Sequence, residues 1–492
     1  MINAEGVRPV AWRPLLVVVG ALAALQVALG GRYGYHRDEL YFVAAGGRPA
    51  WGYPDQPPLT PLLAAAAQAV APGSVTVLRL WAVLAMAGAT LVSGLVAREL
   101  GGGRFAQVLA ALATGLGAFS LLSGHLLATS TIDLTVWVVL SWLVLRSLRT
   151  GDERLWLVAG GVLGAGLLNK QLPVFLAVGI AVGILLTPSA RPVLRSAWLW
   201  CGVLVAAVLW APVLAWQAVH GWPQLTLAGQ IRAEYGTAGE RLGFVALQLV
   251  LFSLAATVLW VLGLVRLLRD PEWSWARVLA WAWVVVLLIF VLTAGQGYYP
   301  AGLYPALIAA GAVVVERTAV PRWLPVAAVV GTSALVVPAV LPVLPAADLD
   351  RSVWAGLGEQ QREMVGWPQL VDQVAHAYRQ LPASERERAV VFTANYGEAG
   401  AVEMFGRSRG LPAVYSGHNG FGLWGPPPQD AGPVVVVWEG GTPSRAFSRC
   451  RFVTRVSGPV RNEETERASI YLCSAPSRGW QQAWPRLVHL SA

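Results

Sequence analysis

The stretch "GGRYGYHRDELYFVAAGGRPAWGYPDQPPLTPLL" (residues 30–63) places three carboxylates between two apolar segments. The acids are Asp38, Glu39 and Asp55, and they lie among aromatic residues and prolines. The flanking apolar runs, at 12–30 and 75–97, are long enough to cross a bilayer, which takes about 20 apolar residues. Carboxylates at a membrane are costly and usually functional. The stretch therefore predicts a membrane fold and a candidate site in its first loop.

The composition supports a membrane protein. The 492 residues are 56% hydrophobic and only 13% charged, whereas a soluble domain carries about 25% charged residues. The net charge of +9 does not indicate a nucleic-acid partner, because the basic residues fall in short gaps between apolar runs and form no stripe. We therefore expect membrane lipids around the chain and no nucleic acid bound to it.

About eleven segments have the length and apolarity of membrane helices. They lie near 12–30, 75–97, 104–124, 131–148, 154–169, 171–187, 196–217, 244–266, 276–294, 300–316 and 322–343. The two segments around Asn169 and Lys170 are short and closely spaced, so they form either two helices or one broken hairpin. The glycine-rich run 160–166 lies inside one segment and predicts close helix packing there.

The arginines predict the orientation of the segments. Alternate gaps between apolar segments are rich in arginine, which is typical of cytoplasmic loops. This pattern puts the N-terminus in the cytoplasm of a multi-pass plasma-membrane protein. The outer gaps are then 31–74, 125–130, 169–170, 218–243 and 295–299.

The composition changes after about residue 345, where ordinary polarity returns. Runs typical of strands alternate with runs typical of helices, which predicts an α/β domain. The expected strands are 388–394, 432–440 and 469–475, and the expected helices are 369–381 and 399–408. We expect a membrane domain over 1–345, with its first outer loop at 31–74, and an extracytoplasmic α/β domain over 346–492.

The three cysteines fall in different settings. Cys201 lies in an apolar run and is expected to be a core residue. Cys450 and Cys473 lie in the polar C-terminal part and can pair if that part faces an oxidising compartment. The sequence alone fixes no geometry for the pair.

The unusual polar residues collect in the outer gaps. A carboxylate at this interface can act as a general base towards a hydroxyl. Lys170, the chain's single lysine, can meet a phosphate as a point charge. Tyrosines at headgroup level can stack on sugars. A base, a phosphate binder and access to lipid together indicate group transfer from a lipid phosphate.

Plainer interpretations of these residues stay open. Asp38 and Glu39 can be solvated loop charges, and Asp133 can cap a helix or stabilise its dipole. Lys170 can reach towards lipid headgroups without binding a ligand. Tyr298 and its neighbour Tyr299 can belong to an aromatic belt.

The motifs resemble a known family. "YHRDELYF" and "WGYPDQPPLTPLL" resemble the first outer loop of the GT-C membrane glycosyltransferases, specifically glycosyltransferase family 39, which includes protein O-mannosyltransferase-like enzymes and the lipid A aminoarabinose transferase. "STIDLTVW", "LLNKQLPVFL" and "GYYPAGLYPALIAAGA" resemble later elements of that family. The chain departs from the pattern at Gln296, where relatives often have a basic residue.

The resemblance implies a GT-C fold and an inverting glycosyltransferase. The donor would be a polyprenyl-phosphate sugar, and the acceptor a hydroxyl of an envelope glycan, lipid or protein. Asp38 would be the catalytic base. The other roles are acceptor positioning or metal binding for Glu39, Asp55 and Asp133; phosphate binding for Lys170, Arg232 and Arg241; and sugar binding for Gln296, Tyr298 and Tyr299.

Two questions stay open at this level. No ligand set proves a metal, although Mg, Mn or Zn at Asp55 or His220 is not excluded by the sequence. In the C-terminal part, Tyr396, His418 and Asn419 either contact the acceptor or form turns.

A transporter or flippase with a carboxylate relay is the alternative function. Transporter sites usually lie near the bilayer midplane, in broken helices of two related halves. Here the acids gather at one face and no paired halves are evident. The glycosyltransferase hypothesis is therefore preferred.

Overall fold

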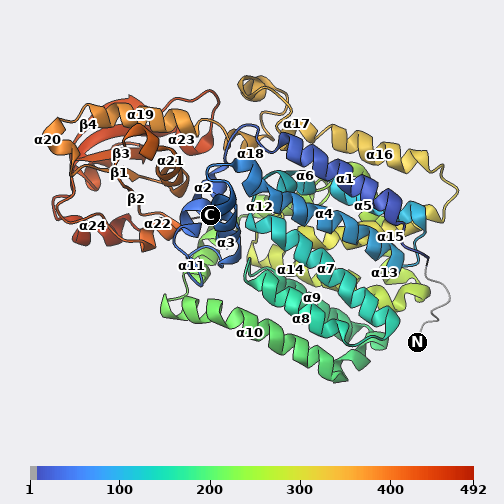
Figure 1. The fold of residues 1–492 in the computed structure, drawn as a ribbon. Coiled ribbons are helices and arrows are strands. Elements are labelled where there is room, and N and C mark those ends of the chain that lie inside the picture. The colour runs from blue at the N-terminus through green and yellow to red at the C-terminus, as the bar shows by residue number, and fades with distance from the viewer. Residues whose placement is uncertain (1–7, 492) are drawn as a thin grey trace. The chain divides into compact units, whose positions relative to one another are not determined.

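A computed structural model describes residues 8–491, which divide into two compact units. The helical unit comprises Met1–Gly30, Arg79–His220 and Ala228–Val337, and the sheet unit comprises Gly31–Leu78, Gly221–Leu227 and Pro338–Ala492. The first loop is thus part of the same unit as the C-terminal segment. Figure 1 shows the elements of both units.

The helices that lie wholly or in part in the helical unit are mostly apolar. They are α1 (Trp12–Leu29), α4 (Val75–Glu99), α5 (Arg104–Gly115), α6 (Ala118–His125), α7 (Thr129–Thr150), α8 (Leu155–Leu167), α9 (Pro173–Leu186), α10 (Ala197–Val219), α11 (Pro223–Glu234), α12 (Ala238–Gln248), α13 (Leu254–Arg269), α14 (Arg277–Thr293), α15 (Tyr304–Glu316) and α16 (Trp323–Ala334). Short 3-10 helices span Pro188–Arg195, Pro271–Ala276 and Tyr299–Leu303.

The expected count of about eleven membrane helices is not confirmed. Within residues 8–491, six helices are long and apolar enough to span a bilayer, and eight spans result if two bent pairs count as one each. The bent pairs are α5 with α6, at 62°, and α9 with the 3-10 helix Pro188–Arg195, at 115°. Each other expected segment holds a helix that is short or interrupted. For example, α8 has 13 residues, and residues 249–253 separate α12 from α13.

Close helix packing at the glycine-rich run is confirmed. A Cβ atom on Gly160 would lie 2.1 Å from the carbonyl oxygen of Gly202, and one on Gly202 would lie 2.2 Å from that of Trp156. Only glycine allows α8 and α10 to approach so closely, because any side chain would collide with backbone.

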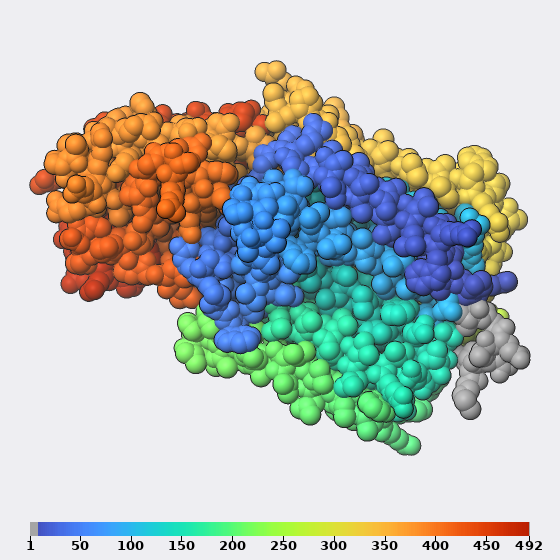
Figure 2. Space-filling model, in the orientation of Figure 1, coloured from blue at the N-terminus to red at the C-terminus, as the bar shows by residue number. Residues whose placement is uncertain are grey.

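The outer face of α10 corrects the prediction for Cys201. This residue is an exposed free cysteine and not a core residue. Figure 2 shows α10, in green, lying on the surface of the helical unit. Its neighbours Trp200 and Leu204 are 59% and 63% exposed. An apolar run in a membrane protein can be apolar because it faces lipid, so apolarity alone does not indicate burial in protein.

A buried acid joins α4 to α7 at one end of the helical unit. The side chain of Glu99 is 1% exposed and lies 2.6 Å from Arg149 Nε, and its other oxygen lies 3.2 Å from Arg146. Removing one partner from a buried ion pair destabilises by about 3–5 kcal/mol, because a charge is left buried and unpaired. Arg146 and Arg149, which the sequence marked only as residues of an arginine-rich gap, therefore also stabilise the packing of α7 against α4.

The sheet unit contains the predicted α/β architecture. Its helices are α2 (Arg37–Gly46), α3 (Leu59–Val70), α17 (Val337–Val340), α18 (Glu359–Arg362), α19 (Trp367–Arg379), α20 (Ala383–Arg386), α21 (Tyr396–Phe405), α22 (Asn419–Leu423), α23 (Glu463–Glu466) and α24 (Trp480–Leu487). Its strands are β1 (Val390–Thr393), β2 (Val414–Ser416), β3 (Val434–Glu439), β4 (Ser448–Arg455) and β5 (Ala468–Ser474). The three expected strands match β1, β3 and β5, while β2 and β4 were not foreseen.

The strands form one mixed sheet in the order β2-β1-β3-β5-β4. The pairs β1–β2 and β1–β3 are parallel, and β3–β5 and β4–β5 are antiparallel. Phe392 and Val436 point from the central strands into a core with Trp480 of α24. Figure 1 shows α19 on the opposite face of the sheet from α24. Both faces of the central strands are thus covered, which explains why β3 is almost continuously apolar.

A disulfide joins Cys450 of β4 to Cys473 of β5, the pairing that the sequence left open.

We predict that the denatured, unreduced protein has one reactive thiol, Cys201, and that reduction exposes three. The disulfide closes a loop between cysteines that are 23 positions apart. Replacing both by serine should lower the free energy of unfolding by about 3 kcal/mol, because the unfolded chain regains the entropy of an open loop. Alkylation with mass spectrometry and thermal unfolding in detergent measure the two effects. Cys201→Ser is the control, and three thiols without reduction would contradict the prediction.

Candidate active site

The start of helix α2 positions Asp38. His36 is the N-cap residue, and its Nδ1 accepts the backbone N–H of Asp38 at 3.2 Å. Glu39 closes a capping box, since its Oε2 accepts the backbone N–H of His36 at 2.9 Å. Asp38 thus lies in the first helical turn, where the helix dipole favours a negative charge.

The side chain of Glu39 takes part in the helix start itself. Its side chain is fully buried and engaged in the capping box. An acid three residues after the cap residue is also a helix-start signal, and the role of Glu39 in positioning an acceptor or a metal stays a prediction. Glu39 therefore shapes the turn that carries Asp38.

His36 is fixed by a second acid. Its Nε2 lies 2.9 Å from Oε2 of Glu363, and both side chains are almost completely buried. Burial lowers the pKa of His36, but the hydrogen bond to Glu363 and the charges of Asp38 and Glu363 outweigh it, so the net pKa is raised. Because Nδ1 accepts the N–H of Asp38, the hydrogen of the neutral ring lies on Nε2, which faces Glu363.

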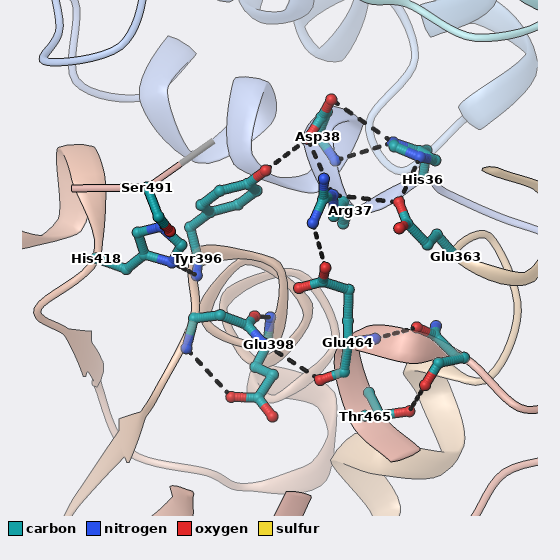
Figure 3. A network of polar contacts seen from close by, with 12 residues as sticks. His36, Arg37, Asp38, Glu363, Tyr396, Glu398, His418, Glu464, Thr465 and Ser491 are labelled. Carbon is teal, nitrogen blue, oxygen red and sulfur yellow. Dashed lines mark hydrogen bonds and ion pairs between the residues drawn. The ribbon is translucent and has the colours of Figure 1, made fainter. Parts of the chain in front are cut away.

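Arg37 is held by two glutamates from the C-terminal segment. Its Nε lies 3.1 Å from Glu363, and its Nη1 forms an ion pair with Glu464. The same Nε is 3.6 Å from Oδ1 of Asp38. Burial raises the pKa of Glu464 to about 7, although the charge of Arg37 opposes the shift. Figure 3 shows Arg37 between these acids.

Asp38 receives a hydrogen bond from the C-terminal segment. The hydroxyl of Tyr396 donates to Oδ1 of Asp38 at 2.9 Å. The Asp38 side chain is 32% exposed, so solvent or a substrate hydroxyl can reach it. Tyr396, one of the residues predicted either to contact the acceptor or to form a turn, is 6% exposed and points at Asp38.

Asp55 has a tyrosine partner of its own. The hydroxyl of Tyr41 donates to Oδ1 of Asp55 at 2.8 Å and accepts the backbone N–H of Gly420 at 3.0 Å. Burial raises the pKa of Asp55 to about 7, against the hydrogen bond from Tyr41, and the charge of Asp38 adds to the increase. The two loop acids therefore differ in their surroundings.

The other C-terminal candidates are buried. Nδ1 of His418 accepts the backbone N–H of Tyr396 at 3.3 Å, and its Nε2 lies 2.8 Å from the hydroxyl of Ser491. Burial lowers the pKa of His418 to about 3. Asn419 has a φ of 46° and bonds Ser491 through both amide atoms. These contacts favour the turn interpretation of Asn419. His418 contacts the backbone of Tyr396 and so helps to fix its position.

In the helical unit, Lys170 lies among aromatic rings. Its Nζ is 5.0 Å from the ring centre of Tyr298 and 5.3 Å from that of Tyr299, which is cation–π distance. It also lies 3.4 Å from the hydroxyl of Tyr298. Both tyrosines thus contact one ammonium group, whereas residues of an aromatic belt need only lie at the level of the lipid headgroups.

Asp133 lies in the second turn of α7 and does not cap it. Its Oδ1 accepts the indole N–H of Trp137 at 3.0 Å. Asp133 is 7% exposed and close enough to Lys170 for their charges to interact. Asp133 and Lys170 both belong to the helical unit.

Arg241 borders a cavity of about 150 Å³. Tyr235, Glu240 and Phe244 are among the other lining residues. The Nε of Arg241 is buried and has no hydrogen-bond partner among the described residues. Such a group is costly unless a ligand or water satisfies it.

The remaining predicted residues are less defined. Arg232 is exposed on α11, and Gln296 is half-buried, its backbone carbonyl accepting the N–H of Tyr299. His220 is exposed, and its ring stacks on Trp216. Within residues 8–491, no group of three His, Cys, Asp or Glu side chains is arranged to hold a metal ion. Asp55 and His220 therefore gain no support as metal ligands.

Comparisons with known proteins agree with this architecture. A family model described as dolichyl-phosphate-mannose-protein mannosyltransferase matches residues 55–216, which is less than half of the chain. ArnT from Cupriavidus metallidurans, solved with undecaprenyl phosphate and in the apo state, is 14% identical, with a TM-score of 0.61 over 93% of this chain and 97% of ArnT.

A second solved structure is similar over part of its length. The arabinofuranosyltransferase AftD from Mycobacteria is 14% identical, with a TM-score of 0.50 over 94% of this chain and 40% of AftD. No curated protein sequence matches the chain. The resemblance to GT-C membrane glycosyltransferases that the loop motifs predicted is confirmed, and the chain is a multi-pass membrane protein with the GT-C fold.

The raised pKa of Asp55 predicts a pH-dependent stability. Between its unfolded pKa of about 3.9 and its folded pKa of about 7, the folded protein binds the extra proton, so this stabilising contribution is lost as the pH rises through 7. Asp55→Asn keeps an acceptor for Tyr41 and removes the titration. We expect the two thermal midpoints to converge below about pH 4, and at pH 8 a variant more stable by on the order of 4 kcal/mol. If the thermal midpoints of wild type and Asp55→Asn differ by the same amount at every pH, this linkage is wrong.

Proposed function

We propose that the protein is an inverting glycosyltransferase that moves a sugar from a polyprenyl phosphate to a hydroxyl acceptor. The observation that carries the proposal is the position of Asp38, an accessible carboxylate held by a helix start and by a tyrosine hydroxyl. The fold that it shares with ArnT, which was solved with undecaprenyl phosphate, supports the class of donor.

The reaction would be a single displacement at the anomeric carbon. Asp38 accepts the proton of the acceptor hydroxyl as that oxygen forms a bond to the anomeric carbon. The bond from this carbon to the phosphate oxygen breaks, and the electron pair leaves with the phosphate. Attack opposite to the leaving group inverts the anomeric configuration. The exposed fraction of Asp38, 32%, agrees with its need to contact an acceptor.

Lys170 and Arg241 are the proposed partners of the phosphate. The ammonium of Lys170 is held over two tyrosine rings. Arg241 borders a cavity, and its Nε has no hydrogen-bond partner within residues 8–491. Stabilising the charge that develops on a leaving group is often the largest single catalytic effect. Arg232 is exposed and is a weaker candidate for the same role.

We propose that the sheet unit lies on the outer side of the plasma membrane, with the N-terminus in the cytoplasm. Disulfides persist in oxidising compartments, so the bond between Cys450 and Cys473 supports this side. The arginine-rich alternate gaps support the same orientation. An outer location fits a polyprenyl-linked donor and an acceptor hydroxyl on an envelope glycan, lipid or protein.

Replacing the proposed base tests the mechanism. Asp38→Asn should lower the rate of sugar transfer by about 10²- to 10⁴-fold, because an amide cannot accept the proton. The measurement is product formation by purified protein from a panel of undecaprenyl-phosphoryl sugars with envelope extract as acceptor. Asp372→Asn is a matched control, since Asp372 is 62% exposed and forms an ion pair with Arg409. Near-normal turnover by Asp38→Asn would show that this carboxylate is not the base.

A binding measurement tests Lys170 without requiring turnover. Lys170→Gln should weaken binding of undecaprenyl phosphate by about tenfold, because the phosphate loses a charge-assisted hydrogen bond. Lys170→Arg should keep most of the affinity, and Asp38→Asn should keep all of it. Ligand-induced shifts of the thermal midpoint in detergent report the affinities. Equal affinity in Lys170→Gln and wild type would remove Lys170 from the phosphate site.

A further inference from the structure

We propose that Tyr396 is a positioning residue for catalysis: its hydroxyl sets the orientation and proton affinity of the Asp38 carboxylate. The inference rests on the proposed role of Asp38 as the base. It assigns to the C-terminal segment a part in the chemistry, separate from any contact with the acceptor. The contact that carries it is the hydrogen bond of 2.9 Å from the Tyr396 hydroxyl to Oδ1 of Asp38.

The direction of the Tyr396 side chain is determined by its surroundings. Tyr396 is the first residue of α21, which Asn395 caps, and its backbone N–H donates to His418. Its ring packs against the ring of Tyr41 at 4.9 Å and that of His418 at 4.7 Å between centres. A ring that is 6% exposed and packed in this way cannot turn without disturbing its neighbours. The hydroxyl is therefore preorganised towards Asp38.

The packing of α21 against α2 keeps donor and acceptor at a fixed separation. A Cβ atom on Gly400 would lie 2.9 Å from the Cβ and 3.0 Å from the carbonyl carbon of Leu40. Gly400 and Tyr396 are one helical turn apart, as are Leu40 and the start of α2. The close backbone contact therefore lies beside the hydrogen bond and maintains its geometry.

The proton of this hydrogen bond belongs to Tyr396. Burial raises the pKa of Tyr396 well above its usual value, and the charge of Asp38 adds to the increase. The hydroxyl therefore stays protonated and donates to the carboxylate. A donor to the ionised form of an acid favours that form, so loss of the hydroxyl should make Asp38 easier to protonate.

Arg37 does not replace Tyr396 in this role. Its guanidinium is directed to Glu363 and Glu464, and its Nε is 3.6 Å from Asp38, beyond hydrogen-bond distance. The Tyr396 hydroxyl makes the shorter contact with Oδ1. Other titratable or charged groups of the sheet unit around the Asp38 carboxylate are His36, Asp55, Glu363 and Glu464.

The second loop acid is supported in a parallel way. Tyr41 donates to Asp55, and the backbone N–H of Gly420 fixes the Tyr41 hydroxyl. Tyr41 and Tyr396 pack ring against ring. Asp38 and Asp55 thus each receive a tyrosine hydroxyl, and the C-terminal segment supplies Tyr396 to the first pair and the Gly420 N–H to the second.

Tyr396→Phe tests the inference, because it removes the hydroxyl and keeps the ring. We expect kcat to fall by about 10- to 100-fold, as for other misplaced catalytic groups. The acid limb of the kcat/KM profile should move to higher pH by about half a unit to one unit, while the KM for the undecaprenyl-phosphoryl sugar stays unchanged. Tyr471→Phe is the matched control, since its hydroxyl donates to the carbonyl of Gly441 in the same unit.

A second readout needs no transfer activity. A water-soluble carbodiimide modifies protonated carboxyls, and mass spectrometry of the peptide that contains Asp38 gives the pH of half-modification. This pH should be higher in Tyr396→Phe than in wild type or Tyr471→Phe. An unchanged pH of half-modification together with unchanged kcat would overturn the positioning role.

The outcomes separate this inference from the proposed function. If Asp38→Asn is inactive while Tyr396→Phe behaves as wild type in both readouts, the positioning role is wrong and the base assignment stands. If Asp38→Asn is active but the carbodiimide profile shifts in Tyr396→Phe, the hydroxyl controls the carboxylate and the base assignment is wrong. Thermal midpoints within about 2 °C of wild type confirm that each variant is folded.

Discussion

The ion pairs of Arg37 with Glu363 and Glu464 tie helix α2 to the C-terminal segment, and the geometry of the loop acids depends on them. Glu363 also holds His36, whose other ring nitrogen accepts the N–H of Asp38. These side chains are mostly buried, so losing one partner would leave an unpaired charge at a cost of about 3–5 kcal/mol. The cost keeps the first turn of α2 in place. From that turn Asp38 meets Tyr396, and further along the helix Tyr41 meets Asp55.

Much of the fold follows from patterns in the sequence. Long apolar runs predicted α1, α4, α7 and α10, because a bilayer sets a minimum length for a helix that crosses it. The valine-rich run at 432–440 predicted β3, which is buried on both faces. The sequence could not show which apolar runs break: the interruption before α13 depends on Ser253 capping a new helix start. The sequence also could not show that Cys201 is exposed, because a lipid-facing residue and a core residue are equally apolar.

The candidate site could be predicted only in part. The acids of the first loop stand out because charge is rare in this chain, and Lys170 stands out as the single lysine. Their partners do not stand out: Glu363 and Glu464 are ordinary glutamates in a polar segment, more than 300 positions from Arg37. Only the fold pairs them with the loop. Two helix-start signals for Glu39 and Tyr396 are nevertheless present in the sequence. His36 and Glu39 have the spacing of a capping box, and "NYGE" at 395–398 has the same spacing, which places Tyr396 at a helix start.

The most direct test is a structure of the protein in lipid nanodiscs with a polyprenyl-phosphonate sugar that cannot be cleaved. An acceptor oxygen lies about 3 Å from its base and about 3–3.5 Å from the carbon that it attacks. Because the angle at the attacking oxygen is roughly tetrahedral, the account predicts the anomeric carbon about 5 Å from the Asp38 carboxylate, with the phosphonate on the opposite face of the sugar. A donor bound with its phosphonate towards Asp38, or with the anomeric carbon beyond the reach of an intervening hydroxyl, would contradict it.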